Sequence, residues 1–400
     1  MRTFHAASLL VAALGLSAGC FASHARDERP DPARADTGLA PLDDDAGVDA
    51  GPPRSPSACA VGPVPIFDVG GAYLGNATVV SRGPDYAVGW THPGGPQGLV
   101  IVKRDGRLVP AGPDAAVRAI ALDDGYLLAP HYGHTFWRAT VDGASIGEPL
   151  VLPDSAPPHW QFFEAHEGVM GLVGHSPFDA APVVYRIDLE AWSFTRDPSA
   201  SPSRSYLWGF SGREALTYYR PVTGPPGAWL RSRRLHPGGA VVFDVRFSEL
   251  DPRVIRFDGE TDTWLLAGAR ISDGSIRRAA LARVSASGEV LDLATLPDDA
   301  LAADLLRTDG VRAAVAASPT GAAVALRPAY QGQERMTGLT VAFHAPGSDT
   351  LVPYATLLGA PTAWSPTIAW SDADAGFAVV TVERNAEGGG VLSLRCGLRP

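Results

Sequence analysis

Short apolar runs alternate with turn-forming residues through most of the chain. Seven of these runs begin at Tyr86, Tyr126, Val169, Ala215, Trp264, Ala322 and Phe377. A connection rich in Gly, Pro or Asp follows each run and leads into a second β-like run, as in "YAVGWTH" followed by "GLVIVKRDG". Runs rich in β-branched and aromatic residues and bounded by turn formers are typical of strands. The pattern therefore predicts seven β-hairpins.

Further strand-like runs flank these hairpins. Those before the hairpins begin at Ala77, Val117, His159, Ser205, Val254, Arg312 and Thr367. Those after the hairpins begin at Arg107, Pro149, Ala191, Ala240, Val290 and Thr350. Four strands that recur about every 49 residues predict an all-β fold, a seven-bladed β-propeller of four-stranded blades. A pair of β-sandwiches is the alternative, but its strands would not fall so regularly into fours.

The seventh unit lacks a fourth strand at its own end, because the sequence stops just after "LSLRCG". The run "VPIFDV" at 64–69 supplies one, so we expect the N-terminal strand to close the last blade and leave no free edge. In such an antiparallel pair the end of the third strand lies beside the start of the fourth. This predicts a disulfide between Cys59 and Cys396. Two unrelated thiols are the alternative.

The first twenty residues have the layout of a secretory signal peptide. Arg2 is followed by an apolar run at 6–16 that is too short to span a bilayer. The stretch "LSAGC", which ends at Cys20, resembles a bacterial lipobox. The resemblance implies cleavage after residue 19, lipidation of Cys20 and, because Phe21 follows, sorting to the outer membrane. An ordinary secretion signal with an incidental cysteine is the alternative.

Residues 20–57 show no apolar periodicity and are dominated by Pro, Asp, Ala and Gly. Such a composition does not bury enough apolar surface to offset the cost of ordering the chain. The sequence therefore predicts three parts: a signal peptide at 1–19, a lipidated cysteine with a disordered acidic linker at 20–57, and a propeller domain at 58–400.

The net charge of −10, with a single lysine and no basic block, argues against nucleic acid as a partner. Patterns for a serine-hydrolase elbow, a zinc protease or a phosphate-binding loop are missing from the sequence. His131 and His134 are expected to be loop residues rather than zinc ligands. We therefore expect no cofactor and no metal, and the sequence identifies no catalytic residue.

Polar side chains stand at or beside the end of each second strand. They are His92, His131, Tyr132, His175, Arg220, Arg270, Arg327, Glu383 and Arg384. In a propeller these strand ends share one face, where Arg and His would suit a carboxylate, sulfate or phosphate group. The alternative is that strand ends are simply where polar residues lie. Further candidates for ligand stacking, with packing between blades as the alternative, are Trp160, Trp208, Trp364 and Trp370.

The whole chain resembles a lipid-anchored bacterial β-propeller protein, but no residue motif assigns it to a particular propeller family. The resemblance implies a cell-envelope protein held at the outer membrane, acting as a binding scaffold for a protein, a peptide or an anionic glycan. An extracytoplasmic carbohydrate-active enzyme, a glycan hydrolase or lyase, is the alternative. Such an enzyme commonly needs two carboxylates, whereas Glu383 is the one acid among the strand-end residues.

Overall fold

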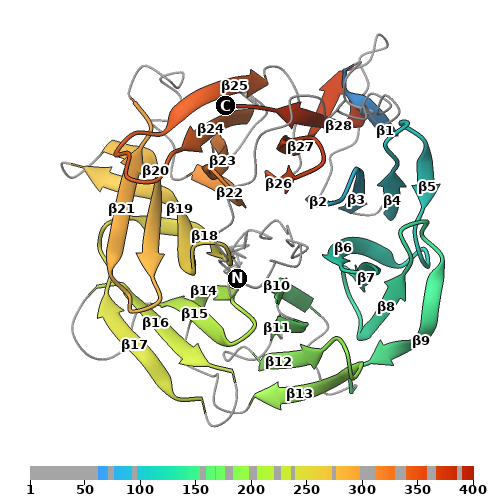
Figure 1. Cartoon of the computed structure of the whole chain (residues 1–400), viewed down its shortest axis with the longest axis horizontal. Coiled ribbons are helices and arrows are strands. Elements are labelled where there is room, and N and C mark those ends of the chain that lie inside the picture. Colours follow the sequence, from blue (N-terminus) through green and yellow to red (C-terminus); the bar gives the residue numbers. More distant parts are fainter. Residues whose placement is uncertain are drawn as a thin grey trace, which may run out of the picture.

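A computed structural model describes the propeller part of the chain. The described residues are 62–70, 76–91, 97–153, 159–166, 168–175, 183–197, 205–219, 227–235, 239–272, 276–297, 311–328, 339–357, 366–384 and 390–400. Within these ranges 28 strands form seven four-stranded antiparallel sheets, which are arranged as blades in a ring (Figure 1). The predicted seven-bladed β-propeller is confirmed. The predicted signal peptide and linker lie outside the described residues.

The first four blades follow one another along the chain. Blade 1 contains β2 (Asn76–Arg82), β3 (Asp85–Thr91), β4 (Gly98–Val102) and β5 (Leu108–Pro110). Blade 2 contains β6 (Ala116–Leu122), β7 (Gly125–Pro130), β8 (Thr135–Ala139) and β9 (Ser145–Val151). Blade 3 contains β10 (His159–His166), β11 (Val169–His175), β12 (Val183–Asp188) and β13 (Ser193–Asp197). Blade 4 contains β14 (Ser205–Phe210), β15 (Glu214–Tyr219), β16 (Trp229–Arg234) and β17 (Val241–Arg246).

The last three blades complete the ring. Blade 5 contains β18 (Asp251–Asp258), β19 (Thr263–Ser272), β20 (Ile276–Ser285) and β21 (Val290–Thr295). Blade 6 contains β22 (Val311–Ser318), β23 (Gly321–Pro328), β24 (Leu339–His344) and β25 (Val352–Leu357). Blade 7 contains β26 (Ile368–Ser371), β27 (Gly376–Arg384), β28 (Gly390–Leu398) and, as its outer strand, β1 (Val64–Gly70).

The first strand of every blade lies nearest the centre of the ring. Each of these inner strands contacts the first strands of both neighbouring blades (Figure 1). Strands β3 and β7, second from the centre, are buried along their whole length, whereas the outer strands β9 and β17 are largely exposed. A strand that is buried on both faces has a continuous apolar sequence, which explains the apolar runs that predicted the second strands.

β1 closes the ring by pairing with β28. The two strands are antiparallel, with Val64 opposite Leu394 and Gly70 opposite Gly390. Strands from the two ends of the described chain therefore share one sheet, which confirms the predicted closure. The ring of Phe67 stacks on Trp90 of blade 1 with centroids 5.2 Å apart, so β1 also packs against the neighbouring blade.

Hydrogen bonds tie blade 7 to blade 1 along the inner strands. The backbone N–H of Val79 donates to Oγ1 of Thr367 at 3.0 Å, and the buried Tyr86 hydroxyl donates to Asp374 at 2.5 Å. Burial is the main cause that raises the pKa of Tyr86 well above its usual value, and the hydrogen bond to Asp374 is the second cause. The phenol therefore stays neutral and donates. The junction between blades 7 and 1 is therefore held by hydrogen bonds as well as by apolar packing.

The single lysine joins blade 1 to blade 2. Lys103 Nζ lies 2.6 Å from a carboxylate oxygen of Asp85 and 3.0 Å from one of Asp142, which belongs to the turn between β8 and β9. Burial lowers the pKa of Lys103, but the hydrogen bonds and charges of both aspartates outweigh it, and the net shift is upward. Lys103 is therefore a structural contact between blades.

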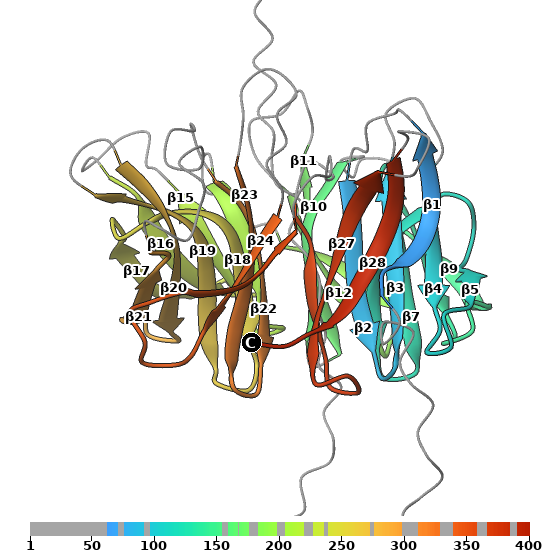
Figure 2. The same cartoon turned by 90° about the horizontal axis from the view of Figure 1, so that it is seen from above.

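The strand directions define two faces of the ring. We call the face at which the second strands end the upper face, because it lies at the top of Figure 2, and the opposite face the lower face. The antiparallel registers place the starts of the first and third strands and the ends of the fourth on the upper face. β1 starts at Val64 on the lower side, and the chain ends on that side at Pro400.

Gly89 gives a test of the packing between blades 1 and 2. A Cβ atom at this position would lie 2.0 Å from the carbonyl oxygen of Val117 in β6. Because overpacking of this kind forces the backbone to shift, Gly89→Ala should lower the free energy of unfolding by about 1–3 kcal/mol. Chemical denaturation measures the change. Ser145→Ala on the exposed strand β9 is the control and should change it by less than about 0.5 kcal/mol. Equal stability of wild type and Gly89→Ala would contradict the close approach.

His344 makes the stability depend on pH. The ring is fully buried, Nε2 donates to the carbonyl of Ser348 at 3.0 Å, and Nδ1 has no hydrogen-bond partner among the described residues. Burial is the main cause that lowers the pKa of His344. Arg283 acts in the same direction, while the Ser348 carbonyl and Asp292 oppose the shift.

A lowered pKa in the folded state means that the unfolded chain binds the proton more readily. The stabilisation is therefore present above the unfolded value of about 6.5 and is lost as the pH falls below it. We expect the free energy of unfolding to fall between pH 7.5 and pH 5.5, and to fall less in His344→Gln. Urea titrations at both pH values measure it. Equal losses in the two proteins would rule out His344 as a source.

Candidate functional site

The upper face carries the predicted strand-end residues. His92 and Arg220 lie outside the described residues, and the side chains of His175 and Arg384 are likewise not described. The described ones are His131 and Tyr132 after β7, Arg270 in β19, Arg327 in β23 and Glu383 in β27. Each belongs to the end of a second strand, one strand outward from the centre. Their assignment as a ligand site stays a prediction.

Blade 2 brings three of the upper-face side chains together. Tyr132 is 56% exposed, and its ring lies edge-on to that of His131 with centroids 4.2 Å apart. Below them Arg118 of the inner strand β6 is only 3% exposed, with a guanidinium nitrogen 3.5 Å from Nδ1 of His131. Burial lowers the pKa of Arg118 to about 10, so it remains charged at neutral pH. An exposed aromatic ring therefore stands above a buried cation.

Blade 5 places two arginines directly opposite each other. Arg270 at the upper end of β19 pairs in register with Arg278 of β20. In these strands Leu266 and Ala282 belong to the apolar cluster that includes Trp208 of blade 4. Since alternate residues of a strand share a face, Arg270 and Arg278 also lie on the face toward blade 4. Two positive charges therefore meet at the upper end of the junction between blades 4 and 5.

Blade 6 repeats the arrangement. Arg327 at the upper end of β23 is directly opposite Arg312 of the inner strand β22, and both side chains are partly exposed. The sequence reasoning missed Arg278 and Arg312, because it considered only the ends of the second strands. The register of the predicted hairpin identifies Arg278, and the register of the first with the second strand identifies Arg312.

Glu383, the predicted acid of the set, is already engaged in an ion pair. Its carboxylate accepts a hydrogen bond from Nε of Arg395 at 2.8 Å, across the pair of strands β27 and β28. Thr381 Oγ1 donates to the same oxygen at 3.3 Å. Glu383 is therefore already engaged by Arg395 and Thr381.

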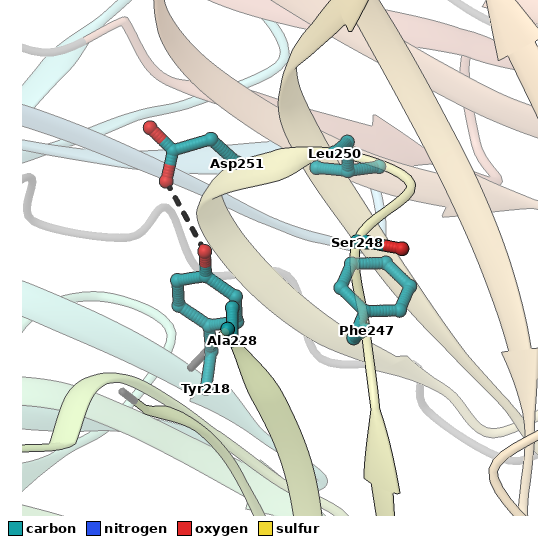
Figure 3. Close-up of a pocket in the computed structure, with 7 residues that line it drawn as sticks. Tyr218, Ala228, Phe247, Ser248, Leu250 and Asp251 are labelled. Atoms are coloured by element: carbon teal, nitrogen blue, oxygen red, sulfur yellow. Dashed lines mark hydrogen bonds between the residues drawn. The ribbon is translucent and has the colours of Figure 1, made fainter. Parts of the chain in front are cut away.

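A small pocket opens between blades 4 and 5 on the upper side. It has a volume of about 230 Å³ and is lined by Tyr218, Gly227, Ala228, Phe247, Ser248, Leu250 and Asp251 (Figure 3). The Tyr218 hydroxyl donates to Oδ1 of Asp251 at 3.4 Å, and Arg253 donates to Oδ2 at 3.0 Å. Asp251 lies opposite Ala269 in the sheet of blade 5. The pocket therefore lies at the upper end of the junction between blades 4 and 5, where β18 begins.

Of the tryptophan candidates, Trp364 lies outside the described residues and the side chain of Trp160 is not described. Trp208 is 2% exposed and stacks with Phe210, whose ring lies against Gly171 of blade 3, so packing between blades explains it. Trp370 is partly exposed and donates from Nε1 to Asp372 at 2.6 Å.

Neither a metal site nor the predicted disulfide can be assigned from the described part of the chain. Among the described residues there is no group of three or more His, Cys, Asp or Glu side chains that could hold a metal ion. Cys396 lies in β28 and is 9% exposed, whereas Cys59 lies outside the described residues. The pairing of these two cysteines stays a prediction. The described residues also include no helix long and apolar enough to cross a membrane.

No protein-family model and no curated protein matches this sequence. Among solved structures, the chain is similar to the β-propeller domain of the Trilobed protease from Pyrococcus furiosus, with 13% identity and a TM-score of 0.50 over 82% of this chain and 94% of that one. It is also similar to the acylaminoacyl peptidase of Pyrococcus horikoshii, with 11% identity and a TM-score of 0.50. That match covers 82% of this chain and 52% of the peptidase.

At these identities the similarity shows the fold alone. The Pyrococcus furiosus domain has an open velcro topology, whereas the present chain pairs β1 with β28. The chain is thus a seven-bladed β-propeller whose ring is closed by strand pairing between the two ends of the described chain.

Proposed function

We propose that this chain is a membrane-anchored binding scaffold of the cell envelope, whose upper face recognises anionic groups on a protein, a peptide or a glycan. The observation that carries the proposal is the pair of opposed arginines in each of two adjacent blades, Arg270 with Arg278 and Arg312 with Arg327. The guanidinium fork matches carboxylate and phosphate geometry, so each pair concentrates donors for such groups on the upper face.

The arginines of blades 5 and 6 stand out because the chain as a whole is acidic. The whole sequence carries −10, so a group of arginines at the upper ends of blades 5 and 6 is a local reversal of sign. Across the ring, the exposed Tyr132 above His131 and Arg118 offers a stacking surface beside positive charge. Both features lie on the face where strand ends and connecting loops are free to make contacts.

The enzyme alternative has less support. A glycan hydrolase needs a carboxylic acid that can give up its proton and usually a second carboxylate at a set distance. Glu383 is ion-paired with Arg395, and Asp251 accepts hydrogen bonds from Tyr218 and Arg253. Both carboxylates are thus engaged by neighbouring side chains of the propeller, and no pair of them is assembled around a common pocket in the described part of the chain.

Replacing the strand-end arginines tests recognition. Arg270→Ala combined with Arg327→Ala should weaken binding to anionic glycans or acidic peptides on an array at least about tenfold, because each charged hydrogen bond contributes about 1.5–3 kcal/mol. Arg107→Ala removes an exposed arginine between β4 and β5 on the lower face and is the control. Unchanged binding by the double variant would refute the proposal.

The anchor has a separate test. If Cys20 carries the lipid, Cys20→Ala should move the protein from the membrane fraction to the soluble fraction, since acyl chains supply the membrane affinity. Fractionation of cells that express either form, followed by immunoblotting, measures the distribution. Retention of the variant in the membrane fraction would show that something other than Cys20 holds the protein there.

A further inference from the structure

A turn of blade 6 is bonded to the outer strand of blade 5. The turn at 345–350 joins β24 to β25. Thr295 at the end of β21 donates its N–H to the carbonyl of Asp349 and accepts from the N–H of Leu351, both at 3.0 Å. The two bonds make a parallel bridge between Thr295 and Thr350, which lies outside the antiparallel sheets of the blades. The turn therefore joins blades 5 and 6 near their outer strands.

His344 at the end of β24 holds this turn in place. Its ring is fully buried, and Nε2 donates to the carbonyl of Ser348 in the turn at 3.0 Å. Ser348 donates from Oγ to the carbonyl of Thr350 and accepts from the N–H of the same residue, both at 3.1 Å. Thr350 is the residue that is bridged to Thr295. A short series of hydrogen bonds thus connects the imidazole with the bridge between the blades.

The imidazole faces a buried arginine of blade 5. Ala342, two residues before His344, belongs to the apolar cluster that also contains Leu281 of β20. Since alternate residues of a strand share a face, His344 is directed to the junction between blades 5 and 6. By the same argument Arg283, two residues after Leu281, is directed to that junction from blade 5. The two side chains are 0% and 6% exposed, so neither reaches solvent freely.

The other charged groups of the junction offer little compensation for a further positive charge. Arg283 lies 3.7 Å from Asp258, with which it forms a buried ion pair. Arg256 of β18 is also buried and shares a face with Asp258, and Asp292 of β21 is directly opposite Arg283. On blade 6, Asp349 of the turn is exposed. Among the described residues, blade 5 therefore directs two arginines and two aspartates to this junction, and one of the aspartates is already paired.

We propose that His344 and the turn at 345–350 form an acid-sensitive clasp that holds blade 6 to Thr295 of blade 5. A neutral ring that donates from Nε2 presents the lone pair of Nδ1, which has no partner among the described residues. A proton on Nδ1 would create a buried donor without an acceptor there, and a second positive charge facing Arg283. When the turn leaves Thr295 the ring reaches water and keeps its proton, so acid favours the open clasp. The clasp is independent of ligand recognition on the upper face.

The expected size of the effect follows from the proton that the open clasp binds. With the clasp open the ring has the ordinary pKa of about 6.5, whereas burial lowers the pKa while the clasp is closed. The closed clasp is therefore fully favoured above the ordinary value and loses its advantage as the pH falls below it. For a ring that stays neutral in the closed form, the equilibrium constant for opening rises about tenfold between pH 7.5 and pH 5.5.

Hydrogen–deuterium exchange of the full-length protein, followed by mass spectrometry, tests the clasp. The N–H groups of Thr295 and Leu351 are the reporters, because both bond across the bridge. After correction for the intrinsic exchange rate at each pH, peptides that cover them should lose protection about tenfold between pH 7.5 and pH 5.5. Peptides from β28 should stay protected over the same labelling times, since their exchange requires the ring of blades to unfold. Labelling of β28 together with the reporters would show global unfolding and would overturn the proposal.

One substitution connects the opening to the imidazole. His344→Gln keeps an N–H donor for the Ser348 carbonyl and removes the titrating group, so the protection of the reporter peptides should be the same at both pH values. His134→Gln makes the same replacement in blade 2 and is the matched control, which should retain the tenfold change. If His344→Gln loses protection with pH as the wild type does, the imidazole is not the acid sensor and the proposal is overturned.

A measurement on the wild type covers the case in which His344→Gln does not fold. Exchange of the imidazole C2 hydrogen, followed over pH by mass spectrometry, reports the titration of His344 directly. A midpoint below the ordinary value of histidine, together with the loss of protection at Thr295 and Leu351, supports the clasp. A midpoint at or above that value would overturn it. These outcomes leave the upper-face function untouched, because the array experiment tests that function separately.

Discussion

The pairing of β1 with β28 is the constraint on which the rest of the structure depends. A ring of blades buries the faces of its sheets only if the first and last blades stay in contact. Here the outer strand of blade 7 comes from the other end of the propeller chain, so the blade is complete only when the two ends meet. The pairing also covers the edge of β28, and β1 becomes the outer strand of blade 7, as the fourth strand is in the other blades. The cluster of Val79, Val380 and Leu392 then joins blade 7 to blade 1 as part of the core.

Packing between blades leaves little freedom to the inner strands. Their alternate residues belong to two different apolar clusters, one on each side, as Ala313 and Ala314 do in β22. Changes of side-chain volume in an inner strand therefore affect the packing against both neighbouring blades. Polar contacts also join neighbouring blades, both along the inner strands, as from Val79 to Thr367, and in turns, as from Lys103 to Asp142. Variation with little structural cost is therefore expected on the two faces and on the exposed outer strands.

Much of the fold could be predicted because a strand buried on both sides has a continuous apolar sequence. All seven blades begin near the runs found in the sequence, and the fourth strand of blade 7 was found because one was missing at the end. The site was less predictable. Arg278 and Arg312 become partners of Arg270 and Arg327 only through the register, and the pocket depends on how blades 4 and 5 meet. In the sequence Glu383 has no evident partner, because its ion pair is with Arg395, twelve residues further along the chain in the neighbouring strand β28.

The place where β1 joins the ring has a consequence for orientation. β1 starts on the lower side, whereas the arginine pairs of blades 5 and 6 lie at the upper ends of their strands. If the protein is attached to a membrane through the N-terminal side of β1, as proposed above, the attachment joins the underside of the ring. The cationic strand ends are then on the face opposite the point of attachment.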